Sequence, residues 1–90
     1  MAREKISNII RVDGSVERLP EEVDDMELEA VQKIVGGYVE HVGIVGIGAM
    51  WCNEDGLQLK LPFNLEARLI TRLPVVGDVI IETFEEITNA

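Results

Sequence analysis

The sequence predicts a small α+β fold in which one main helix packs on a curved, mostly antiparallel sheet. A helix is indicated over about residues 25–35, because apolar side chains recur there at helical spacing. These apolar residues are Leu28, Val31, Ile34 and Val35. Segments with strand patterns and turn signals lie on both sides of the helix, and they supply the sheet that its apolar stripe needs to cover.

Both ends of this helix carry recognisable signals. Asp24 can accept hydrogen bonds from the free amides of the first turn, and Glu27 can reach back to the amide of that cap. Gly36 and Gly37 offer the positive φ that a helix-terminating turn requires. We therefore expect Asp24 to cap the helix and the glycine pair to end it.

A hairpin is predicted before the helix. An apolar set over residues 6–12 forms a first strand with imperfect alternation. Asp13-Gly14 is a hairpin turn signal, and residues 15–19 form a short return strand.

More strands are predicted after the helix. Residues 39–52 form either one long bent strand or two strands joined near Gly43. Leucines alternate with polar residues over 57–61, so this segment predicts a half-buried strand that completes a hairpin with residues 49–52.

The last third of the chain begins with a break at Pro62. Asn64 stands where a cap would, which predicts a second short helical turn near residues 64–70. A turn at Gly77-Asp78 then leads into a buried strand that starts at Val79.

Length and charge restrict the classes of protein. Ninety residues support one domain, 1–90, whose ends at 1–4 and 86–90 are expected to be flexible. The formal net charge is −9, and the eight basic residues form no cluster, so the surface repels phosphate backbones. One Trp, one Tyr and two Phe leave few platforms for base stacking. Direct nucleic-acid binding is therefore not expected.

The lone Cys52 cannot form an internal disulfide, and no Cys and His spacing suggests zinc. We therefore expect a cytoplasmic protein without a metal or cofactor. The longest weakly polar run, residues 42–52, is too short to span a bilayer and contains three glycines. A membrane association is not expected.

Four short motifs occur in order along the last two-thirds of the chain. They are Val31-Gln32-x-x-Val35-Gly36-Gly37-Tyr38-Val39-Glu40, Asn53-Glu54-x-Gly56, Leu61-Pro62-x-Asn64-x-x-Ala67 and Gly77-Asp78-Val79-Ile80-Ile81. Together they resemble a family of small phage and mobile-element proteins catalogued as domain-of-unknown-function family 3846. The resemblance implies a phage or mobile-element origin and a small α+β fold, and it implies no established activity.

The residues needed for catalysis are scarce. His41 lies next to Glu40 in a predicted strand, where adjacent side chains point to opposite faces, so the two cannot readily act as an acid–base pair. Cys52 has no second histidine to activate it and is expected to be an inert thiol. We therefore expect no enzymatic activity and no catalytic residue.

A small-ligand site has better support. Polar residues on or just after turns can converge at the rim of a sheet beside flat aromatic walls, and such a site suits a nucleotide-like anion. The candidate residues are Tyr38, Trp51, Asn53, Asn64, Arg68 and Arg72. The same asparagines are also ordinary turn and cap residues, and the aromatic pair is ordinary core rim, which is the favoured interpretation.

Our first hypothesis is a phage-type accessory protein, with a counter-defence role, that sequesters a small nucleotide-like ligand stoichiometrically. We also expect a homo-oligomer, because the predicted hairpin over 44–61 is more apolar than one face of a small sheet needs.

The alternative is an acidic protein-interaction module, or nucleic-acid mimic, that inhibits a host DNA-binding protein. Its candidate surface is the acidic run before the helix, which is also explained as a helix-start and solubility feature. This run contains Glu21, Glu22, Asp24 and Asp25. A plain structural or regulatory subunit is the third hypothesis.

Overall fold

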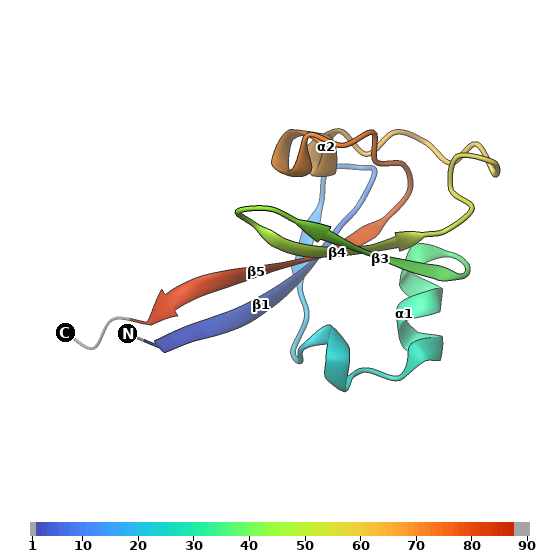
Figure 1. The fold of residues 1–90 in the computed structure, drawn as a ribbon. Coiled ribbons are helices and arrows are strands. Elements are labelled where there is room, and N and C mark those ends of the chain that lie inside the picture. The colour runs from blue at the N-terminus through green and yellow to red at the C-terminus, as the bar shows by residue number, and fades with distance from the viewer. Residues whose placement is uncertain (1, 88–90) are drawn as a thin grey trace.

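A five-stranded sheet forms the centre of the computed structural model, which describes residues 2–87 (Figure 1). Every neighbouring pair is antiparallel, and the strand order is β2-β1-β5-β4-β3. The strands are β1 (Ala2–Ile10), β2 (Val16–Arg18), β3 (Val39–Ile44), β4 (Gly48–Asn53) and β5 (Val79–Ile87). The other elements are the 3-10 helix η1 (Val23–Asp25) and the helices α1 (Leu28–Val35) and α2 (Leu65–Thr71). The predicted α+β class is confirmed.

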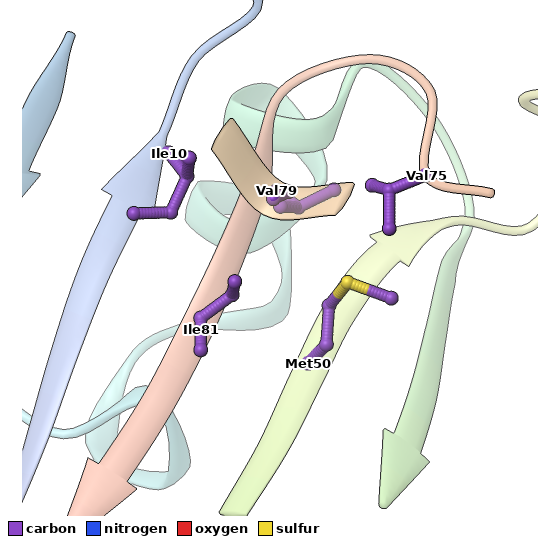
Figure 2. Close-up of a cluster of buried hydrophobic side chains, with 6 residues drawn as sticks. Ile10, Met50, Val75, Val79 and Ile81 are labelled. Atoms are coloured by element: carbon purple, nitrogen blue, oxygen red, sulfur yellow. The ribbon is translucent and has the colours of Figure 1, made fainter. Parts of the chain in front are cut away.

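The two helices cover opposite faces of the sheet (Figure 1). Successive side chains of a strand point to opposite faces, so the apolar run of β5 supplies both cores. Ile80 packs with Ile9 and Val31 on the α1 face, whereas Val79 and Ile81 belong to the cluster on the α2 face. Figure 2 shows this second cluster, in which Ile10, Met50 and Val75 surround them. The unbroken apolar run therefore reflects burial on both faces.

The predicted Asp24 cap is wrong. Helix α1 begins at Leu28, its N-cap is Glu27, and the Glu27 side chain makes no cap hydrogen bond. Asp24 lies in η1, which the extended residue Met26 separates from α1. The burial of Val23 in the core explains this separate turn. If α1 extended back to residue 23 without a break, Val23 would lie along the axis of α1 instead of at its buried position. The predicted end is confirmed, because Gly36 adopts φ 81° and its amide donates to Gln32 O.

The predicted strand over 57–61 is also wrong. Residues 54–60 form turns, Lys60 has φ 55°, and the amide of Leu61 donates to the carbonyl of Gly56. Leu57 is 69% exposed, so the leucine alternation does not mark a buried face. The hairpin partner of β4 is β3, and their connection lies at residues 45–47 instead of near Gly43.

The two central strands extend beyond their neighbours. Strands β1 and β5 pair over nine residues, from Ala2↔Ile87 to Ile10↔Val79. β2 pairs with only the last three residues of β1, so the outer part of β1 and β5 projects as a two-stranded ribbon (Figure 1). The expected flexible ends therefore include paired residues, 2–4 and 86–87, while residues 1 and 88–90 lie outside the described part.

Gly48 is expected to be essential for joining β4 to β5. A Cβ atom at this position would overlap the Glu82 carbonyl oxygen, and the backbone has φ 146°. We expect Gly48→Ala to lower the free energy of unfolding by about 3 kcal/mol, measured by urea denaturation. Gly43→Ala is the matched control, because a Cβ there meets nothing within 4 Å. Equal stability of the two variants would contradict this account.

Candidate functional site

The six predicted ligand residues lie on both faces of the sheet. Trp51 is half-buried on the α1 face, with its ring centroid 4.7 Å from that of His41. Tyr38 is 70% exposed just after α1. Arg68 and Arg72 belong to α2 and its C-cap, which cover the opposite face. The structure therefore does not bring the set together into one site.

Asn53 is buried and connects β4 to the end of α1. Its Nδ2 donates to Val35 O at 3.2 Å, and its Oδ1 accepts from the amide of Asp55 at 2.8 Å. A Cβ at Gly37 would lie 2.9 Å from Nδ2, so the Gly-Gly turn also makes room for this amide. The side chain fixes the position of the helix against the sheet.

Asn64 is fully buried and holds three segments together. Its Nδ2 donates to Ile10 O at 2.8 Å and to Gly77 O at 2.9 Å, and its Oδ1 accepts from the amide of Ala67 at 3.0 Å. The predicted cap of the second helix is thereby confirmed. Both asparagines use their amides inside the protein, which accounts for their burial.

An arginine–aromatic pair lies at the beginning of α2. The Arg68 guanidinium carbon is 4.0 Å from the centroid of the Phe63 ring, and Nε donates to Val75 O at 3.1 Å. Phe63 is 63% exposed, so this cation–π pair faces solvent. Arg72 follows one turn later with φ 61°. Phe63 was not predicted from the sequence as a site residue, although its place beside an N-cap and five residues before an arginine was the available signal.

A groove of about 600 Å³ lies between β1 and the segment that leads into η1. Its charged and polar lining includes Lys5, Ser7, Arg18, Glu21, Glu22 and Asp25. Among the side chains that the structure describes, the carboxylates of Glu21, Glu22 and Asp25 have no ion-pair partner. Three of the four residues of the predicted acidic surface therefore line one groove.

The groove also contains an unpartnered buried hydroxyl. Ser7 is 3% exposed, and within residues 2–87 its Oγ has no hydrogen-bond partner. The Ser7 position pairs with Glu82 across the central strands, and Glu82 Oε1 is likewise buried without a hydrogen bond. Because side chains alternate between the two faces of a strand, Glu82 could have been predicted to lie on the same face as Ile80, which packs on α1. No signal in the sequence indicated that Ser7 would be buried.

Lys5 balances part of this negative charge. Its Nζ lies 3.5 Å from Glu82 Oε1 and 3.4 Å from Asp24 Oδ2. The charge of Glu82, followed by the hydrogen bond to Asp24, raises the pKa of the Lys5 ammonium above its usual value. Lys5 is therefore held in its charged form beside the groove.

A second, smaller groove of about 210 Å³ lies on the α2 face beside β3. Met50, Cys52 and Val75 contribute to its apolar lining, and Glu40 and Glu54 also line it. Burial, and then the charge of Glu40, raise the pKa of the Cys52 thiol. A raised pKa favours the neutral thiol and opposes nucleophilic chemistry.

The described residues were also searched for a metal site and for a membrane-spanning helix. Within residues 2–87, no three His, Cys, Asp or Glu side chains are placed to share a metal ion. Neither helix in this range has the length and apolar character that a membrane crossing requires.

The model of the family described as Domain of unknown function (DUF3846) matches residues 6–87. The chain belongs to this family. Comparison with curated proteins and with solved structures finds no match. The resemblance stated from the four motifs is thus confirmed at the level of the family, and the match extends to β1 and the acidic segment.

Substitutions of Asn64 test how much its hydrogen bonds stabilise the fold of this DUF3846 chain. We expect Asn64→Ala to lower the free energy of unfolding by about 3 kcal/mol, because two buried carbonyls and a helix cap lose their partner. Asn64→Asp keeps the cap acceptor but places an oxygen against Ile10 O and Gly77 O, so it should destabilise the protein as well. Urea denaturation measures both, and a stable Asn64→Asp variant would show that the cap alone matters.

Proposed function

We propose that the chain is a stoichiometric binding protein whose acidic groove holds a basic segment of a partner protein. The observation that carries the proposal is that Glu21, Glu22 and Asp25 line the same groove as Ser7, whose buried hydroxyl has no hydrogen-bond partner among the described residues. Ammonium and guanidinium groups donate hydrogen bonds and carry positive charge, so they complement both features. The size of the groove falls within the range of ligand sites.

A DNA-binding protein is the partner class that we favour. Such proteins present lysine and arginine side chains to phosphates, and an acidic groove competes for the same side chains. The net charge of −9 supports attraction over a longer range. The proposal is for binding without turnover, and it assigns no role to Cys52, whose thiol pKa is raised by burial.

The test uses a fluorescent octa-arginine peptide in about 0.1 M salt. We expect the variant with Glu21→Gln, Glu22→Gln and Asp25→Asn to bind about tenfold more weakly, measured by anisotropy, because three ion pairs are lost. The control carries Glu29→Gln, Glu66→Gln and Glu85→Gln, which change the net charge equally on exposed positions outside the groove. Equal weakening by both variants would show diffuse attraction and contradict a groove site.

A small anionic, nucleotide-like ligand is the second candidate function. It is favoured by the exposed stack of Arg68 on Phe63, with Arg72 nearby, since arginine binds phosphate bidentately and an aromatic ring can support a base. Asn53 and Asn64 would take part only by giving up internal hydrogen bonds. The site that we propose therefore comprises Phe63, Arg68 and Arg72.

Thermal unfolding with ATP or a cyclic dinucleotide tests this site. At about 100 times Kd, a ligand should stabilise the protein by about 2.7 kcal/mol, and the shift should shrink in Arg72→Gln. Arg72 is exposed and its side chain forms no hydrogen bond among those described, so the apo variant should unfold at the same temperature as the parent. If neither nucleotide raised the unfolding temperature, the proposed nucleotide site would be contradicted.

We further propose a phage or mobile-element origin, a counter-defence role in the host cytoplasm, and a homo-oligomer. The origin rests on the resemblance to the family, and the counter-defence role is proposed as one that suits a small binding protein of that origin. The oligomer is supported by exposed apolar side chains on α2 and on the segment that precedes it, namely Leu57, Leu59, Phe63, Leu65 and Leu69. Light scattering measures the mass in solution, and a monomer at high concentration would contradict the oligomer.

A further inference from the structure

Strand β3 is an edge of the sheet with free backbone groups. It pairs only with β4, and the register is uniform from Val39↔Asn53 to Ile44↔Gly48. The amide of Glu54 donates to Tyr38 O, which fixes the phase of the hydrogen-bonded pairs. Because these pairs alternate along an antiparallel ladder, the amides and carbonyls of Val39, His41 and Gly43 point away from β4.

This edge has few of the features that discourage strand addition. Residues 39–44 contain no proline and no lysine, and the uniform register leaves no bulge. A Cβ at Gly43 would meet nothing within 4 Å, so no side chain covers the face of the sheet at this position of the edge strand. The opposite edge, β2, is only three residues long and contains Glu17 and Arg18.

The smaller groove lies beside this edge on the α2 face. Glu40 and Val42 point to that face, since Val42 packs against its core cluster and Glu40 is two residues away. A volume of about 210 Å³ is below the range of small-molecule sites and suits one long side chain. The apolar lining matches an aliphatic stem, and the carboxylates of Glu40 and Glu54 match a positive end group.

We propose that β3 takes up an extended basic segment of another protein as a sixth strand, with a lysine or arginine side chain in the smaller groove. Backbone hydrogen bonds to Val39, His41 and Gly43 supply a sequence-tolerant part of the affinity, and the groove supplies the preference for a basic residue. Charge at the edge itself selects this occupant over a second copy of the chain, because a second β3 would bring its own Glu40 to the edge.

The first test is amide hydrogen exchange with a capped eight-residue peptide of alternating valine and lysine. We expect the peptide to protect the amides of Val39, His41 and Gly43, whereas those of Glu40 and Val42 are already protected by β4. The same peptide with alternate N-methylated amides should not bind. Binding of the valine–lysine peptide without this alternating protection would overturn the proposal.

The second test compares two variants of Gly43. Gly43→Pro removes an outward amide and leaves the β4 ladder intact, and proline is tolerated on edge strands. We expect about tenfold weaker peptide binding by calorimetry, while Gly43→Ala binds as the parent does. Urea denaturation confirms that both variants are folded. Equal affinities of two folded variants would overturn strand addition.

Two further outcomes decide the occupant. We expect Glu40→Gln to weaken binding of the valine–lysine peptide about threefold and to leave binding of a valine–serine peptide unchanged. If the parent protein bound both peptides with equal affinity, the preference for a basic residue would be overturned. Protection of the Val39, His41 and Gly43 amides that increases with protein concentration alone would assign the edge to a second copy and overturn the proposed partner. These readings concern β3, so they remain valid if the octa-arginine test of the acidic groove fails.

Discussion

The pairing of β1 with β5 is the constraint on which the rest of the fold depends. These strands occupy the middle of the sheet, and alternate residues of β5 are fully buried against opposite helices. Displacing β5 by one residue would turn Ile80 to the α2 face and Val79 or Ile81 to the α1 face. The side chains would then no longer fit the two cores in shape. Asn64 reinforces the same arrangement, because its amide bonds the last residue of β1 and the turn before β5.

Local signals in the sequence predicted the elements well where one face or one cap decides the structure. The apolar stripe of α1, the glycine pair after it and the Asn64 cap all act within a few residues, and each was found. The alternating leucines of 57–61 led to a wrong strand prediction, because alternation indicates a buried strand face only where a neighbouring strand is available. Both edges of β4 are already paired, with β5 and with β3, so residues 57–61 have no place beside it. The Asp24 cap failed because Val23 is drawn into a tertiary core that no local pattern contains.

The candidate sites were less predictable than the fold. Ser7 and Glu82 meet across strands about 75 residues apart in the chain, and sequence spacing does not report such a pairing. The acidic residues before α1 were recognised, but only the packing of that segment beside β1 makes three of them line one groove. Conversely, Asn53 and Asn64 looked like ligand residues because polar turn residues that hold a backbone in place have the same composition as those that bind a ligand.

The central strand pair also has a consequence for how the protein is made. β1 leaves the ribosome before the other strands of the sheet, whereas its main partner, β5, is the last of them to be translated. Until then β1 can pair only with the three residues of β2, and most of its backbone is unprotected. The high sequence separation of this contact implies slow folding, because β1 and β5 must find each other across most of the described chain.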